Sequence, residues 1–331
     1  MPIFARIAAL AGLVLAIVLI ARYDYRELGN AMLSVGWGII VIAAIHLLQT
    51  LCSAMAWRQA ISTSWTDKRL LFLLARLVRE GVSNLLPVAH VGGDIVGARI
   101  LTLRGANPSI AAASLIVDLT LEVITQVVFT LMGLSALMIV HGNSDLVRWA
   151  AIGLAVGALG AAGFVLAQRF GLFQMIESLL EKLATHWNWE GLGKLTDLHG
   201  NAVRLYKHRG NVLAGGFYHL MSWLLGTVEI WAGLYFLNVP IALHEALIFE
   251  SLAQAIRSAA FVVPGAIGVQ EAGFIALGQL FGITPEIALA LALVKRFREV
   301  LLGLPSLLAW HYIEGRRPSW NASMNGTGTP P

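Results

Sequence analysis

The feature that most constrains this chain is an internal repeat in which every matched pair of residues lies 177 positions apart. The charged and turn-forming pairs are Pro87/Pro264, Asp94/Glu271, Gly105/Gly282, Pro108/Pro285 and Glu122/Glu299. Apolar pairs such as Ala111/Ala288 and Val117/Val294 follow at the same spacing without a gap. A long repeat in apolar sequence is typical of membrane transporters built from two similar halves. The repeat therefore favours movement of a substrate across a bilayer over cleavage or synthesis of one.

The composition indicates a membrane protein. Hydrophobic residues make up 57% of the 331 residues and charged residues 13%, whereas soluble domains carry about 25% charged residues. The net charge of +4 is a modest excess, which cytoplasmic loops of a membrane protein account for, so we expect no nucleic-acid partner. The single cysteine, Cys52, excludes an internal disulfide and a cysteine-rich metal site.

Six apolar stretches are long enough to cross the membrane as helices. They cover residues 3–21, 35–60, 108–140, 147–169, 212–237 and 285–313. An alternative for 3–21 is a signal peptide. The following residues 22–25 lack a small-residue cleavage pattern, which favours a retained helix.

The polar segments divide the chain into two membrane halves. These halves cover residues 1–170 and 212–315, with a linker at 171–211 and a disordered tail at 316–331. The linker contains an amphipathic stretch near 171–186. Lys and Arg are concentrated in the linker and at the start of the tail, so the positive-inside rule predicts that the linker and both termini are cytoplasmic.

Two further apolar regions, 70–104 and 247–281, are interrupted near their middle by proline and glycine. Proline removes a backbone donor and clashes within a helix, and glycine loosens the backbone further. Each region is too long for one span and slightly short for two, which predicts a re-entrant helical hairpin. The expected hinge residues are Pro87, Gly92, Gly93, Pro264, Gly265 and Gly268.

The predicted fold is an all-α integral membrane protein with about six transmembrane helices, two re-entrant helical hairpins and two inverted structural repeats. In this scheme the first hairpin enters from the cytoplasm and the second from the opposite side. Inverted repeats with broken helices near mid-membrane are found in many alternating-access carriers. One additional or missing span would make the repeats parallel instead.

Polar and charged residues within the apolar regions are the candidate substrate-binding residues. They are Arg76, Arg79, Glu80, Asn84, Asp94, Arg99, Asp118, Glu122, Arg257, Gln270, Glu271, Lys295, Arg296, Arg298 and Glu299. Charges inside a membrane are costly and usually mark a pathway or a paired network. We expect the cations to line a site for an anionic headgroup. The alternatives are structural ion pairs and side chains that reach toward an interface.

Two more specific expectations concern equivalent positions of the repeat. Asp118 and Lys295 are equivalent and opposite in charge, which predicts contact between them near an axis that relates the halves. Asp94 and Glu271 are both acidic and follow a proline break, so each could cap the next helix instead of binding a ligand.

Other polar residues point less strongly to chemistry. Glu229 and Glu250 are intramembrane acids without an evident partner, for which proton coupling is one alternative. The histidines are dispersed, and we expect no metal and no cofactor. The sequence contains no phosphate-binding loop and no catalytic motif such as G-x-S-x-G or H-E-x-x-H, so we expect neither ATP hydrolysis nor an enzyme.

The motif residues together resemble a known family. The run from Arg79 to Pro87, the Gly92-Gly93-Asp94 motif, and the run from Val263 to Glu271 are similar to the flippase-like transmembrane domain of lysylphosphatidylglycerol synthases. This domain is also the membrane half of the bacterial multiple peptide resistance factor. The segments around Asp94 and from Lys295 to Pro305 resemble most closely the stand-alone branch associated with hopanoid biosynthesis.

This resemblance implies a protein of the bacterial inner membrane that transfers lipids between leaflets. No aminoacyl-transfer domain follows in this sequence, so lipid lysylation is not carried over. We expect a flippase-like translocase of an anionic phospholipid or a hopanoid-type lipid. The alternatives are a small-solute carrier, a membrane enzyme acting on a lipid, and a non-transporting scaffold for lipid synthesis. The expected partners are membrane lipids, with hopanoid or lipid biosynthesis enzymes and a second copy of the chain as further candidates.

Overall fold

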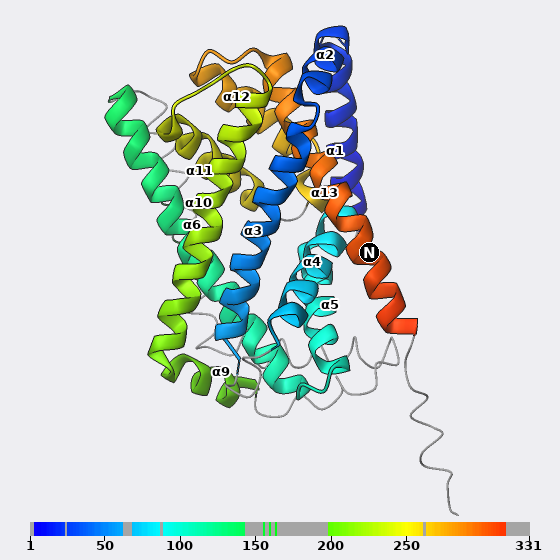
Figure 1. Ribbon diagram of the computed structural model, residues 1–331, viewed down its shortest axis with the longest axis vertical. Helices are drawn as coiled ribbons and strands as arrows, with labels where there is room; N and C mark the ends of the chain where they lie inside the picture. Colours follow the sequence, from blue (N-terminus) through cyan, green and yellow to red (C-terminus); the bar gives the residue numbers. More distant parts are fainter. Residues whose placement is uncertain are drawn as a thin grey trace, which may run out of the picture.

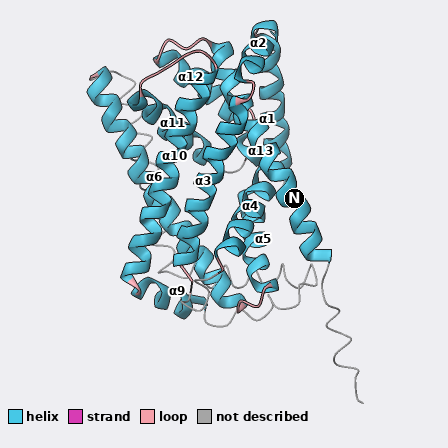
Figure 2. Ribbon diagram, in the orientation of Figure 1, coloured by secondary structure: helices cyan, strands magenta, loops and turns pink. Residues whose placement is uncertain are grey.

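The computed structural model describes residues 3–23, 25–61, 68–86, 89–142, 198–260 and 263–315, together with positions 155, 159 and 163. Every described element is a helix (Figures 1 and 2). The first half contains α1 (Ile3–Arg22), α2 (Tyr25–Val35), α3 (Gly38–Gln59), α4 (Arg69–Leu85), α5 (Ala89–Leu103) and α6 (Pro108–His141). The predicted linker contains α9 (Leu198–Lys207), and the second half contains α10 (Arg209–Phe236), α11 (Leu243–Ala259), η2 (Pro264–Ala266), α12 (Val269–Leu280) and α13 (Pro285–Gly315).

The all-helical class is therefore confirmed for the described residues. Two helices, Gly38–Gln59 and Pro108–Val140, are long and apolar enough to cross a membrane. The segments predicted as spans at 3–21, 212–237 and 285–313 are helical, as α1, α10 and α13, and their crossing of the membrane stays a prediction. The span predicted at 147–169, the amphipathic stretch near 171–186 and the tail lie outside the described residues, apart from the three isolated helical positions.

The structure contains one helix that the predicted spans and hairpins do not include. Residues 25–35 form helix α2. Its apolar residues Leu28, Ala31 and Val35 recur at helical spacing and are buried against the bundle. The segment is too short and too polar to register as a span, although its periodicity is that of an amphipathic helix.

The helix boundaries follow the 177-residue spacing of the sequence. Helices α3 and α10 end at Gln59 and Phe236, and helices α6 and α13 begin at Pro108 and Pro285. A proline at the first helical position needs no hydrogen-bond partner and is preset for the helix, which explains the shared starting point. Gly105 and Gly282, which precede these helices, both have positive φ, at 96° and 66°.

The packing of the helices also follows this correspondence. Helix α3 packs against its counterpart α10, α4 packs against α13, and α11 packs against α6. The pair α4–α5 lies toward the end of the bundle that carries α9, and the pair α11–α12 lies toward the end that carries α2 (Figure 1). The helix pairs α4–α5 and α11–α12 therefore lie toward opposite ends of the bundle.

The first shorter pair is interrupted where the sequence predicts it. Helix α4 ends at Leu85, and Leu86 is extended, with φ −103° and ψ 145°. Pro87 lies outside the described residues. The expected hinge residues Gly92 and Gly93 lie within helix α5 instead of between the helices. A Cβ at Gly93 would collide with the carbonyl oxygen of Arg79, so this glycine permits the close approach of α5 to α4.

The second interruption is longer and contains the unusual backbone. Between α11 and α12 lies the short η2 helix, and Gly265 and Gly268 have positive φ of 61° and 79°. These angles are accessible to glycine without the strain that a side chain would add. Among the expected hinge residues that the structure describes, Gly265 and Gly268 have positive φ, whereas Gly92 and Gly93 do not.

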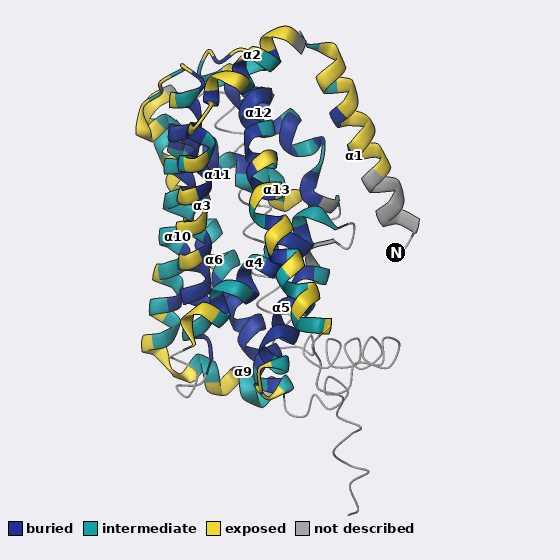
Figure 3. Cartoon of the chain, turned by 45° about the vertical axis from the view of Figure 1, so that its right-hand side comes forward, coloured by how far each residue is buried: buried dark blue, intermediate teal, exposed yellow. Residues whose placement is uncertain are grey.

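Many charged residues are buried inside the bundle and many large apolar residues are exposed on its surface, unlike in a soluble protein. Two large apolar clusters form the core, yet many other buried residues are charged. Large apolar residues such as Val14, Ile139 and Leu308 lie exposed on the outer surface. Figure 3 shows the exposed face of α1 at the edge of the bundle. An apolar exterior around a charged interior is the arrangement that a lipid environment favours.

Candidate functional site

The charged residues form a buried network of ion pairs, and its first cluster centres on Arg79 of α4. Its guanidinium donates from Nε to Asp94 Oδ1 at 2.5 Å, from Nη1 to Asp118 Oδ2 at 2.9 Å and from Nη2 to Glu122 Oε2 at 3.1 Å. One side chain therefore joins α4, α5 and α6. We call Arg76, Arg79, Asp94, Asp118, Glu122 and His219 the first cluster.

Arg76 lies one turn before Arg79 and shares its acceptors. Its Nη2 donates to Glu122 Oε1 at 2.6 Å, and its Nε donates to Glu80 Oε1 at 3.0 Å. The two arginines hold Glu122 from both sides. Bidentate pairs of this kind fix geometry more firmly than single charge contacts.

The predicted contact between Asp118 and Lys295 is wrong. Asp118 is fully buried and receives bonds from Arg79 and from Nε2 of His219, the latter at 2.9 Å. Lys295 instead pairs with Glu250 of α11 at 2.9 Å. Each residue is paired with an opposite charge on a neighbouring helix of its own half, Arg79 of α4 and Glu250 of α11.

The second cluster consists of Arg257, Gln270, Glu271, Arg296 and Glu299. Arg257 of α11 donates from Nη1 to Gln270 Oε1 and to Glu299 Oε1, both at 2.8 Å. Arg296 of α13 donates to Glu271 Oε1 at 2.9 Å and to Glu299 Oε2 at 3.1 Å. The cluster thus joins α11, α12 and α13.

The two alternatives for Glu271 are combined in one side chain. While its Oε1 accepts from Arg296, its Oε2 accepts from the backbone N–H of Gly268 at 2.6 Å, at the N-terminus of α12. Asp94 differs, because α5 begins at Ala89 and Asp94 lies beyond its first turn. Asp94 therefore pairs with Arg79 and does not cap a helix.

Glu229 and Glu250 have partners that the sequence did not reveal. Glu229 of α10 pairs with Arg298 at 2.9 Å, and Glu250 pairs with Lys295. Both acids face α13, which carries a surplus of cations in the stretch 295–298. The sequence contained one signal for these pairs. The stretch 295–299 has three cations and one carboxylate, so its cations need acids from other helices.

His46 of α3 is a further residue that sequence analysis missed. Its Nε2 lies 3.3 Å from Glu80 Oε2 of α4, and its Nδ1 lies 3.3 Å from Glu229 Oε2 of α10. Gln49, one turn later, donates to the same Glu229 oxygen at 2.5 Å. We call the path Glu80–His46–Glu229–Arg298 the bridge, because it connects α4 with α10 and α13 through α3.

A second connection between the halves is a neutral one. Arg257 of α11 donates from Nη2 to Asn84 Oδ1 of α4 at 2.9 Å. Asn84 is the last polar residue before the interruption at the end of α4. The side chain that holds the second cluster together therefore also contacts the interrupted end of the first hairpin.

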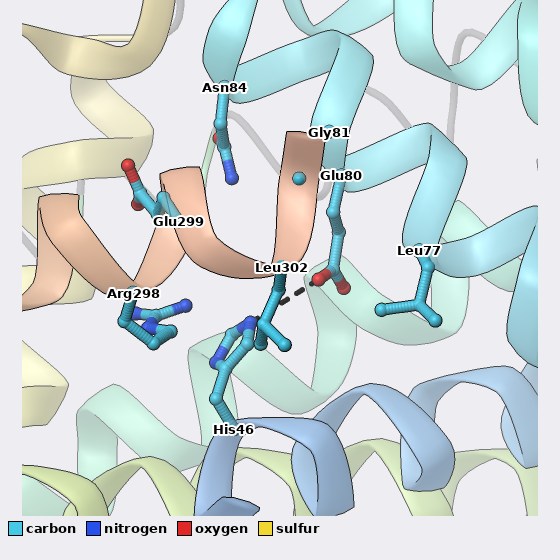
Figure 4. A pocket seen from close by; sticks show the side chains of 9 residues that line it. His46, Leu77, Glu80, Gly81, Asn84, Arg298, Glu299 and Leu302 are labelled. Atoms are coloured by element: carbon cyan, nitrogen blue, oxygen red, sulfur yellow. Dashed lines mark hydrogen bonds and ion pairs between the residues drawn. The ribbon is translucent and has the colours of Figure 1, made fainter. Parts of the chain in front are cut away.

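A pocket lies between these connections (Figure 4). It has an empty volume of about 240 Å³ including its open mouth. Its lining residues are His46, Leu77, Glu80, Gly81, Asn84, Arg298, Glu299, Leu302 and Gly303, from α3, α4 and α13. A smaller pocket of about 180 Å³ lies beside Arg257, Gln270 and Lys295.

Three buried donors of the network have no acceptor in the structure. Arg298 Nε belongs to the larger pocket, Gln270 Nε2 to the smaller one, and Arg296 Nη2 to the second cluster. A buried donor without an acceptor costs about 1–3 kcal/mol, and more for a charged group. These donors are suited to the oxygens of a ligand.

Of the fifteen candidate residues, Arg99 alone lies apart from this network. It pairs with Glu314 at 2.8 Å, near the end of α13. Glu314 lies about 22 Å along the helix axis from Glu299, since each residue adds about 1.5 Å. Arg99 therefore joins α5 to the end of α13 at a distance from the pocket.

Among the described residues no cluster of His, Cys, Asp or Glu has the arrangement of a metal site. Instead the network pairs cations with an excess of acids. Its cations are Arg76, Arg79, Arg257, Lys295, Arg296 and Arg298, and its acids are Glu80, Asp94, Asp118, Glu122, Glu229, Glu250, Glu271 and Glu299. No described cation of the network is thus free of a carboxylate, and a ligand must replace or join an existing pair.

Comparison with known families gives one match. The model for the lysylphosphatidylglycerol synthase TM region matches residues 3–306. Searches of curated proteins and of solved structures give no match. The resemblance found in the sequence motifs is confirmed at the level of the family, while the hopanoid-associated branch stays a prediction.

Proposed function

Because this chain belongs to the family of lysylphosphatidylglycerol synthase membrane regions, we propose that it moves a membrane lipid between the leaflets of the bacterial inner membrane. The headgroup passes through the polar pocket between α3, α4 and α13, and the apolar tails remain in the surrounding lipid. The cargo is an anionic phospholipid or a hopanoid-type lipid. The protein is a carrier and not an enzyme, and its termini face the cytoplasm.

The observation that carries this proposal is the position of the pocket. It lies where helices of the two halves meet, beside a charged network inside an apolar bundle. Arg298 lines it with a buried Nε that has no acceptor. A phosphate oxygen is a strong acceptor for a guanidinium, so the headgroup completes the bonds of Arg298.

Because every cation of the described network is paired with a carboxylate, the headgroup must displace a carboxylate in order to bind. In the structure the pocket is narrow, and Arg257 and Arg298 are held by Glu299 and Glu229. A phosphate exchanges with one carboxylate at a time, which avoids leaving a bare charge in the membrane. The corresponding boundaries and packing of the two halves support two inverted repeats that rock around this pocket.

The test is the movement of labelled lipids between leaflets of liposomes that contain the purified protein. We compare the wild type with Arg257→Gln, which removes the contacts with Asn84 and Glu299. The matched control is Arg204→Gln, on the exposed surface of α9. Anionic phospholipid and hopanoid cargo are assayed separately.

We expect acceleration by the wild type and by Arg204→Gln, and a loss of at least about ten-fold for Arg257→Gln, the factor that about 1.4 kcal/mol corresponds to. Acceleration that Arg257→Gln leaves intact would contradict a headgroup path beside Arg257. No acceleration of any lipid by folded protein would favour a scaffold of lipid synthesis.

A further inference from the structure

The bridge contains a histidine with a carboxylate at each ring nitrogen. His46 faces Glu80 through Nε2 and Glu229 through Nδ1, each at 3.3 Å. A neutral imidazole has one N–H donor and one acceptor, whereas the charged form has two donors. Only the charged ring can donate to both carboxylates, so this geometry fits a bound proton.

The charge balance of the network points in the same direction. Six cations face eight carboxylates in the described network, and an excess of buried negative charge is costly. A proton on His46 removes one of the two surplus negative charges. It also supplies the positive charge between Glu80 and Glu229, two acids that would otherwise repel each other across the ring.

We propose that His46 is the binding site of a proton that is coupled to the opening of the pocket. This rests on the proposed lipid transport and names its coupling ion. His46 lines the pocket, and through its ring α3 holds together α4 of one half and α10 of the other. Loss of the proton leaves one of these two contacts without a donor.

The surroundings of the ring determine which contact is lost. The side chain of Glu80 is 24% exposed and that of Glu229 is 1% exposed. The proton therefore leaves from Nε2 into the pocket, and the N–H at Nδ1 stays with the buried Glu229. The contact between α3 and α4 then weakens, which separates α4 from the other helices that line the pocket.

The charged groups around His46 come from four neighbouring helices. They are Glu80 and Arg76 on α4, Glu229 on α10, Arg298 and Glu299 on α13, and Glu122 on α6, which acts through Arg76. On α3 itself, Thr50 donates to Glu80 at 3.2 Å and Gln49 donates to Glu229, but neither titrates. Arg76 and Arg298 keep the two carboxylates ionised when the ring loses its proton.

The first measurement is the protonation of the ring, which does not depend on transport. Protein with ¹⁵N-labelled histidine is titrated in lipid nanodiscs between about pH 5 and pH 9, the range in which imidazoles change charge. We assign the signal by comparison with His46→Gln. The expected result is a ring with two N–H groups at low pH that loses one of them as pH rises.

The second measurement is transport under a pH gradient. If one proton moves with each lipid, a gradient of one pH unit changes the steady-state ratio of cargo between the leaflets by about ten-fold. We expect this response in the wild type and in His244→Gln, a control at an exposed histidine of α11. It is absent in His46→Gln, whose folding is checked by size-exclusion chromatography.

The two measurements separate this proposal from the one it rests on. A ring that stays neutral over the whole range, or a gradient response that survives in His46→Gln, overturns proton binding at His46. Absence of transport for every lipid, together with a ring that titrates as expected, overturns the lipid cargo and supports the proton site. Lipid transport that is indifferent to the gradient overturns the coupling.

Discussion

The two clusters occupy corresponding places in the two halves, yet they are built differently. Both have an acid on the long helix, Glu122 and Glu299, and an acid on the second limb of the hairpin, Asp94 and Glu271. The cations do not correspond. In the first half both arginines are on α4, whereas the second half takes Arg257 from α11 and Arg296 from α13.

The two clusters also differ in how far their arginine side chains are exposed. The side chains of Arg76 and Arg79 are 7% and 8% exposed, whereas those of Arg257 and Arg296 are 16% and 18% exposed. Both pockets border residues of the second cluster, and two of its donors lack an acceptor. The comparison teaches that acids at corresponding positions can be paired with cations from different helices, which leaves one cluster buried and the other beside the pockets.

The largest expected effect comes from removing one buried arginine from each cluster. Arg79→Met leaves Asp94 and Asp118 buried with too little positive charge, and breaking such a pair costs about 3–5 kcal/mol. Arg296→Met is expected to cost less than half as much, because its site is more exposed. Denaturation of the purified variants in detergent measures both. Equal losses would break the distinction between a sealed and an accessible cluster.

A second expected effect concerns the pair that replaces the predicted Asp118–Lys295 contact. Lys295→Met leaves the buried Glu250 without its cation and is expected to cost about 3 kcal/mol. The double variant Lys295→Met with Glu250→Gln should recover most of this loss, since neither charge remains. Stability of the two single variants and the double variant forms a thermodynamic cycle. A double variant as unstable as the sum of the single variants would argue against a direct pair.

A smaller effect distinguishes the two hairpin acids. Glu271→Gln keeps an oxygen for the N–H of Gly268, but Glu271→Ala removes it, so alanine should be worse by about 1 kcal/mol. Asp94 caps no helix, so Asp94→Asn and Asp94→Ala should differ by less. Thermal unfolding of the four variants tests this contrast. A similar gap at both positions would mean that the two acids act alike.

The smallest expected effect lies at the starts of the long helices. Asn107 accepts from the N–H of Ser109 at 2.9 Å, while its counterpart Thr284 is 3.4 Å from the N–H of Ile287. Asn107→Ala should cost about 1 kcal/mol, a usual value for such a cap, and Thr284→Ala less. Unfolding curves of the two variants provide the comparison. A larger loss for Thr284→Ala would contradict the difference in geometry.

The sequence predicted which residues belong to the charged network better than it predicted which of them pair with each other. The 177-residue spacing anticipated which helices correspond, because prolines at Pro108 and Pro285 start their helices wherever the chain places them. Charges within apolar stretches marked most of the network, since such charges are too costly to occur without a reason. The partners of Asp118 and Lys295 depend on how each helix is rotated about its axis, and the spacing contains no such information. His46 escaped attention because a histidine in an apolar helix carries no formal charge.

The position of four charges in one stretch of α13 has a consequence for biosynthesis. Lys295, Arg296, Arg298 and Glu299 lie in the middle of this helix, and each such charge costs about 2.5–3.5 kcal/mol when a helix enters the bilayer by itself. We therefore expect α13 to enter the membrane together with α10 and α11, because Glu229 and Glu250 pair with its cations and offset that cost. The helices that carry these acids precede α13 in the chain, so the acids are present before the cations arrive.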